Sequence, residues 1–279
     1  MRSAGPFVVR GSVAGDFEGR SRGARDRVFF GASALLFVAS AVGTIGWCGS
    51  MSDGMAMPGG WNMSMAWMRM PGQSWPGAAA SFLGMWVVMM VAMMMQSLIP
   101  KLSNDRRTVR RTDETWLGAL TAVAGTGYFF VWTVIGAAAY PLGLGLAAAE
   151  MRWPALAHLV PLATGAVLLL AGCVQLSAWK ARQLGNCRNG PACGRSLSTD
   201  FRSAWRHGLR LGLHCTLCCS GFVMILLTAG VMDLRVMALI AAAITLERLA
   251  PSPERVARAT GVAVVAAAAL VIARALIRP

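Results

Sequence analysis

The segment MWVVMMVAMMMQSLIPKL, residues 85–102, decides the fold class of this chain. It carries no charged side chain before Lys101, and the apolar run that contains it extends from residue 78 to residue 100. A helix needs about 20 consecutive apolar residues to cross the hydrocarbon core of a bilayer. The run therefore predicts a membrane-spanning helix, and we expect Pro100 and Lys101 to end it at the membrane surface.

Six further apolar runs have lengths near those that a membrane-spanning helix requires. They cover residues 28–46, 116–139, 156–179, 211–230, 236–249 and 261–277. Charged residues make up only 14% of the 279 residues, whereas they make up about a quarter of an ordinary soluble domain. The sequence predicts an all-α fold, a polytopic integral membrane helix bundle with seven transmembrane helices over residues 28–279. Six helices remain possible, because the run 236–249 is short.

The net charge of +14 comes from Lys and Arg residues that lie in short blocks between the apolar runs. This distribution is typical of the positive-inside bias of a bacterial inner-membrane protein, and it argues against nucleic acid as a partner. We expect the amino terminus to lie in the cytoplasm, with residues 1–27 as a disordered basic arm. Five basic residues then fall on the periplasmic side: Arg69, Arg152, Arg235, Arg274 and Arg278.

A methionine-rich loop joins the first two predicted spans, at residues 47–77. Thioethers are soft neutral ligands that suit Cu(I), and they resist the oxidative coupling that disables thiols. A periplasmic loop of this kind predicts a copper-binding segment, although methionine also serves as flexible apolar packing in amphipathic segments. The candidate ligands are Met51, Met55, Met57, Met63, Met65, Met68 and Met70.

The second predicted span carries a methionine stripe. At about 100° per residue, Met85, Met89 and Met93 fall on one half of the helix together with Met90 and Met94. We take the first three as candidate metal ligands. The alternative is ordinary helix packing, because methionine is an acceptable apolar residue in a membrane bundle.

The fifth predicted span contains the sequence HCTLCC, residues 214–219. Residues three and four positions apart share one helix face, so His214, Cys215, Cys218 and Cys219 can present several donors to one ion. Thiolates favour Cu(I) or Zn(II), and we expect copper more than zinc because of the methionines. The alternative is that cysteine acts here as a small hydrophobe at helix contacts.

The roles of the remaining cysteines and of two acidic residues are predicted from weaker signals. Cys187 and Cys193 lie in a basic loop and are interpreted as exposed thiols, with metal handover and a reversible disulfide as alternatives. Cys48 and Cys173 are expected to be packing residues. A carboxylate within a span is costly and usually paired. We expect Arg248 or Arg210 to pair with Glu247. We also expect Asp233 to cap the sixth helix.

Residues 78–251 resemble a bacterial family of predicted metal-binding integral membrane proteins, domain-of-unknown-function family 2182 (DUF2182). The resemblance rests on AMMMQS at 92–97, GYFFVW at 127–132, CRNGP at 187–191, CTLCC at 215–219 and GVMDLRVM at 230–237, followed by Glu247. It implies a helical membrane architecture and metal binding. Gln96, Gln183 and Ser220 depart from the family pattern, and Gln183 stands where a further cysteine is common.

Three function classes fit these features. The first is membrane Cu(I) handling, by binding, transfer or assembly of a copper enzyme, which makes a copper enzyme or another membrane-complex subunit the expected protein partner. The second is an accessory subunit of a larger complex, in which sulfur serves helix packing. The third, a thiol oxidoreductase, is disfavoured because no C-x-x-C turn opens a helix. The sequence shows no ATP-binding loop, so a non-enzymatic metal-handling protein is preferred over a pump.

Overall fold

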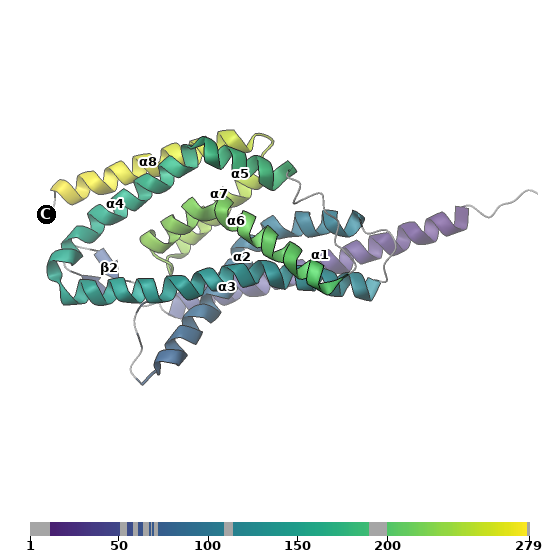
Figure 1. The fold of residues 1–279 in the computed structure, drawn as a ribbon, viewed down its shortest axis with the longest axis horizontal. Helices are drawn as coiled ribbons and strands as arrows, with labels where there is room; N and C mark the ends of the chain where they lie inside the picture. Colours follow the sequence, from purple (N-terminus) through teal and green to yellow (C-terminus); the bar gives the residue numbers. More distant parts are fainter. Residues whose placement is uncertain are drawn as a thin grey trace, which may run out of the picture.

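The computed structural model describes residues 12–50, 55–57, 61–63, 67, 69, 72–108, 114–189 and 200–277. Within these ranges the chain forms α-helices joined by short turns, and one antiparallel hairpin (Figure 1). The helices are α1 Ser12–Ser50, α2 Trp75–Thr108, α3 Glu114–Arg152, α4 Pro154–Leu176, α5 Ala178–Asn189, α6 Phe201–Ala229, α7 Leu234–Leu249 and α8 Pro253–Ile277. The hairpin strands are β1 Met55–Met57 and β2 Trp61–Met63. The predicted helical bundle is confirmed.

Six helices of the described chain are long and apolar enough to cross a membrane, namely α1, α2, α3, α4, α6 and α8. Large apolar side chains on their outer faces are exposed, including Leu35 at 73% and Leu270 at 61%. Such a surface is stable only against lipid. The chain is therefore a polytopic membrane protein. The predicted sixth span corresponds to α7, whose 16 residues are fewer than a membrane-spanning helix requires.

The helices extend beyond the predicted apolar runs. α2 continues to Thr108 with Pro100 inside it, so the prediction that Pro100 ends this helix is wrong. Proline is tolerated within helices of membrane bundles because neighbouring groups satisfy the backbone that it frees. α1 begins at Ser12, so residues 12–27, which were expected in the basic arm, continue the helix, whereas residues 1–11 lie outside the described chain.

The predicted fourth span is divided into two helices. α4 ends at Leu176, and Ser177 has an extended backbone with φ −73° and ψ 151°. The Ser177 hydroxyl accepts a hydrogen bond of 3.2 Å from the backbone N–H of Lys180, which is the contact expected of an N-cap. Helix α5 therefore begins at Ala178 and continues through residues 180–189, which were predicted as a loop, and Lys180 lies in its first turn.

Glycines let α3 and α6 run side by side in the same direction. A Cβ atom at Gly208 of α6 would overlap with the carbonyl oxygen of Ala124, and one at Gly127 of α3 would lie 2.8 Å from the carbonyl oxygen of Trp205. Small residues at helix contacts allow backbones to approach closely in membrane bundles. This close contact places the Cys215 turn of α6 beside the Tyr128 turn of α3.

α4 and α8 form a second close pair, which is antiparallel and lies along one edge of the molecule (Figure 1). A Cβ at Gly172 would lie 2.6 Å from the side chain of Val265, and one at Gly261 would lie 2.8 Å from that of Leu176. The tight α6–α7 turn that follows Ala229 was predicted correctly. Gly230 adopts a φ of +121° there, and the Asp233 carboxylate accepts from the N–H of Arg235 at 2.8 Å, which confirms the predicted cap.

The α3–α6 contact gives a first test. We expect Gly208→Ala to lower the thermal stability of the detergent-solubilised protein by about 1–3 kcal/mol, because the added methyl group meets backbone rather than a flexible side chain. Gly125→Ala is the matched control, since a Cβ at Gly125 meets nothing within 4 Å. Equal melting temperatures for the two variants would contradict the close contact.

Candidate metal centre

The methionine stripe of α2 lies inside the bundle. Met85, Met89 and Met93 are buried, and so are Met90 and Met94 on the same half of the helix. All five belong to one core cluster that also contains Cys215 and Cys219 of α6. The soft side chains of the second and fifth predicted spans therefore share one apolar interior.

Aromatic packing holds α2 in this position. The indole N–H of Trp86 donates a hydrogen bond of 2.9 Å to the carbonyl oxygen of Trp132, and Trp86 covers Gly136 of α3. Both tryptophan side chains are fully buried. A buried Trp N–H needs a partner, so this bond ties α2 to α3 and helps to keep the methionine face inside the bundle.

Cys215 and Cys219 are each 2% exposed and occupy successive turns of α6. Their thiols interact by a hydrogen bond. The Tyr128 hydroxyl donates to the Cys215 sulfur at 2.9 Å. An Arg248 Nη atom lies 3.4 Å from the Cys215 sulfur and 3.7 Å from the Cys219 sulfur. Two buried thiols therefore lie within reach of one guanidinium, which carries a permanent positive charge.

The three cysteines of the predicted His/Cys group contact one another in a row, but they are buried against different helices. Cys218 is buried in a separate small cluster with Leu184 of α5 and Ala257 of α8, although its thiol still reaches that of Cys219. His214 is half-buried. In the described chain no group of three or more His, Cys, Asp or Glu side chains is arranged to hold a metal ion. Any metal shell around the Cys215 and Cys219 pair must therefore include other donor types or have few ligands.

A buried polar network adjoins the cysteine pair. The carboxylate of Glu247, which is 3% exposed, lies 2.9 Å from the ammonium of Lys180, which is 2% exposed. The Gln175 amide donates to the same carboxylate, and the Thr260 hydroxyl donates to it at 3.3 Å. Lys180 also donates to the carbonyl oxygen of Cys218 at 2.7 Å. Four helices, α4, α5, α7 and α8, meet at this pair, and α6 meets it through Cys218.

The predicted partner of Glu247 was wrong. Arg248 and Arg210 were expected, but Lys180 forms the ion pair, because the Ser177 break turns α5 back into the bundle. Sequence reasoning placed Lys180 in an exposed basic loop. The available signal was the composition of α5: AWKARQL begins directly after a serine, which is a helix N-cap pattern.

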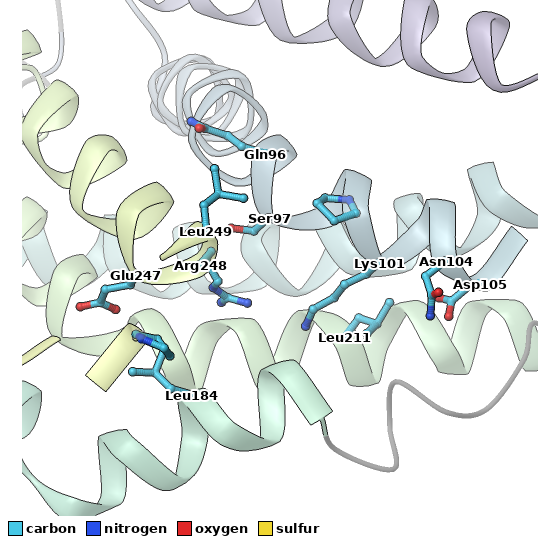
Figure 2. Close-up of a pocket in the computed structure, with 12 residues that line it drawn as sticks. Gln96, Ser97, Lys101, Asn104, Asp105, Leu184, Leu211, Glu247, Arg248 and Leu249 are labelled. Atoms are coloured by element: carbon cyan, nitrogen blue, oxygen red, sulfur yellow. The ribbon is translucent and has the colours of Figure 1, made fainter. Parts of the chain in front are cut away.

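A cavity of about 260 Å³ lies beside Arg248 and reaches the surface between α2, α6 and α7. Figure 2 shows Ser97, Lys101 and Asn104 of α2 along this pocket, with Arg248 and Glu247 on the side away from Asn104. The pocket-lining Asp105 pairs with His207 at 2.9 Å. The pocket therefore brings polar side chains of α2 near the guanidinium that contacts the cysteine pair.

A second sulfur contact occurs at the α6–α7 turn. The buried Cys48 thiol, at the end of α1, lies 4.0 Å from the thioether sulfur of Met232. Cys48 was expected to be a packing residue, and its burial at 2% fits that role. Cys173 is exposed. Cys187 lies in α5, and Cys193 lies outside the described residues.

The methionine-rich loop is described in part. The hairpin register pairs Met55 with Met63 and Met57 with Trp61. Trp67, farther along the loop, packs on Phe82 of α2 with a ring-centroid distance of 5.2 Å, which fixes this part of the loop against the bundle. Four of the predicted ligands lie outside the described residues: Met51, Met65, Met68 and Met70.

Comparison with known proteins places this architecture in a family. The family model described as PpoB2, copper chaperone, matches residues 83–271. The chain belongs to the PpoB2 copper-chaperone family. The match includes the methionine face of α2, the cysteine pair and the Lys180–Glu247 network, and it begins after the methionine-rich loop. No curated protein and no solved structure matches the chain.

Family membership makes copper handling the function class of the chain, and it changes how the core is interpreted. The methionines of α2 and the Cys215 and Cys219 pair belong to the same buried core of this copper-handling protein. Arg248 and Tyr128, which contact the cysteine sulfurs, were missed as site residues. Arg248 was missed because it was assigned to Glu247, and Tyr128 because an aromatic in an apolar span carries no sequence signal for metal.

The buried ion pair gives a second test. We expect Lys180→Met to lower stability by about 3–5 kcal/mol, because it leaves an uncompensated buried carboxylate. The double variant Lys180→Met/Glu247→Gln removes both charges, and it should regain most of this loss while the amide introduced at position 247 keeps the contact with Thr260. Thermal unfolding in one detergent measures both. A single variant as stable as the double variant would show that the two charges are not coupled.

Proposed function

We propose that the chain is a membrane copper chaperone that binds one Cu(I) ion between Cys215 and Cys219 and passes it to a copper enzyme during assembly. The observation that carries this proposal is the buried thiol pair under the guanidinium of Arg248, within a family of copper chaperones. Cu(I) accepts low coordination numbers and prefers thiolate and thioether ligands. Two thiols on adjacent helical turns match that preference better than they match the four ligands of a structural zinc site.

The buried methionines have a secondary role in this proposal. Met85, Met89 and Met93 share the core with the cysteine pair and offer neutral soft donors along α2. A thioether binds Cu(I) more weakly than a thiolate, so the methionines can accept the ion and release it to the cysteine pair. Movement along α2 is compatible with a chaperone, which needs no energy source of its own.

The methionine hairpin is proposed as the loading segment. Directly opposed positions of an antiparallel pair have Cβ atoms about 4.5–5.5 Å apart, so register partners such as Met55 and Met63 can share an ion. We place this hairpin in the periplasm of the bacterial inner membrane, with the amino terminus in the cytoplasm, as the distribution of basic residues predicts. Met51, Met57, Met65, Met68 and Met70 are proposed as further donors of the same loop.

The cysteine pair is tested by metal binding. We expect purified full-length protein to bind one Cu(I) per chain in competition with a chromogenic Cu(I) chelator. Cys215→Ser and Cys219→Ser should each weaken binding by about a hundredfold or more, because a hydroxyl replaces a thiolate.

Two controls accompany this experiment. Cys173→Ser changes an exposed thiol and should leave affinity unchanged. Cys218→Ser changes a buried thiol that faces α5 and α8. Unchanged Cu(I) affinity in this variant indicates a two-cysteine site, whereas weakened affinity indicates a site that includes all three thiols. Stoichiometric copper that survives loss of both Cys215 and Cys219 would contradict the site. A metal-free protein that purifies with tight partner subunits would favour the accessory-subunit interpretation.

The loading role of the hairpin predicts a kinetic defect. We expect Met55→Ile/Met63→Ile to slow transfer of Cu(I) from a donor complex to the chain by about tenfold, with little change in affinity at equilibrium, because the thioethers supply the entry site rather than the final site. Stopped-flow transfer measurements test this. Val28→Ile in exposed α1 is a control for altered apolar surface. An unchanged transfer rate would remove the hairpin from the pathway.

A further inference from the structure

Arg248 adds a positive charge directly beside the two cysteine sulfurs of the proposed metal site. Its guanidinium contacts the sulfurs of Cys215 and Cys219, at 3.4 and 3.7 Å. The neighbouring carboxylate of Glu247 is neutralised by Lys180 at 2.9 Å. The network next to the cysteine pair therefore contributes no net charge of its own, and Arg248 adds a permanent charge of +1 on the sulfur side.

The charge of the loaded site depends on the metal. Two thiolates and one Cu(I) carry −1, and Arg248 brings this total to zero. Two thiolates and one Zn(II) carry zero, and Arg248 brings that total to +1. An uncompensated charge in a partly buried site is unfavourable, so the site in which the charges cancel is preferred.

We infer that Arg248 is the counter-cation of the Cys215 and Cys219 site and restricts that site to a single monovalent soft ion, Cu(I) or Ag(I), against divalent Zn(II). This inference rests on the proposed copper site and adds its selectivity. Arg248 is a positioning residue here, because it acts on the metal through the two sulfurs rather than by coordinating it.

Binding proceeds by exchange of protons for metal. One Cu(I) forms two metal–sulfur bonds, the two S–H bonds break, and both protons leave for the medium. No electrons are transferred. Tyr128, which donates to the Cys215 sulfur at 2.9 Å, keeps its proton and stabilises the thiolate as a hydrogen-bond donor. The protons leave through the pocket that Arg248 lines together with Ser97 and Lys101 (Figure 2).

The fold holds the guanidinium in place. The Thr245 hydroxyl, one turn before Arg248, donates a hydrogen bond of 2.5 Å to the side-chain oxygen of Gln96 on α2. Glu247, one residue before Arg248, is tied to α4, α5 and α8. The end of α7 is therefore fixed on several sides, so Arg248 is oriented before the metal arrives. Gln96, which departs from the pattern of the resembling family, supplies one of these contacts.

The test compares two metals on matched variants. Cu(I) and Zn(II) affinities are measured by chelator competition on full-length protein with Arg248→Gln, Arg248→Lys and Arg235→Gln. We expect Arg248→Gln to lower the ratio of Cu(I) to Zn(II) affinity by about tenfold or more, because it removes the charge that balances the Cu(I) site and opposes the Zn(II) site. Arg248→Lys should retain most of the ratio, since it keeps the charge.

A control variant and the pattern of affinities separate loss of the Arg248 charge from a general disturbance of the fold. Arg235 lies exposed at the opposite end of α7, and Arg235→Gln should leave the ratio unchanged. The inference would be overturned if Arg248→Gln weakened Cu(I) and Zn(II) binding equally. It would also be overturned if Arg248→Lys lowered the affinity ratio as much as Arg248→Gln does. Wild-type protein whose Cu(I) binding does not depend on Cys215 and Cys219 would instead overturn the proposed function.

Discussion

The buried ion pair between Lys180 and Glu247 is the interaction on which the arrangement of this bundle depends. A carboxylate that is 3% exposed in an apolar interior requires a cation within reach. Lys180 meets this requirement because Ser177 ends α4 and caps α5, which turns the chain back into the bundle. Gln175 and Thr260 bind the same carboxylate, so α4, α5, α7 and α8 are joined at one point.

The ion pair also determines what surrounds the cysteines. Because Glu247 is neutralised by Lys180, the next residue of α7 can direct its guanidinium to the sulfurs of Cys215 and Cys219. The close approach of α3 and α6 through Gly208 brings Tyr128 to the same thiols. The cysteine pair therefore lies beside Arg248 and Tyr128, within the part of the chain that matches the copper-chaperone family model. In the proposed site, helix packing and metal binding depend on the same few polar residues.

Much of the fold could be predicted from the sequence, because apolar runs report directly on helices that cross lipid. The breaks and extensions of helices could not be predicted this way. Pro100 was taken as a helix end, although a bundle can satisfy the backbone around it. Lys180 was assigned to a loop, because a lysine is expected at the surface unless a buried carboxylate is known to pair with it. The candidate cysteines were identified from their spacing, but their division between two faces of α6 depends on which helices pack there.

The most direct test of the copper site is X-ray absorption spectroscopy of Cu(I)-loaded full-length protein. The account predicts one Cu(I) per chain with a sulfur-only first shell of low coordination number. It also predicts that this spectrum is lost when Cys215 and Cys219 are replaced by serine. A first shell dominated by nitrogen or oxygen, or an unchanged sulfur shell in the double serine variant, would contradict it.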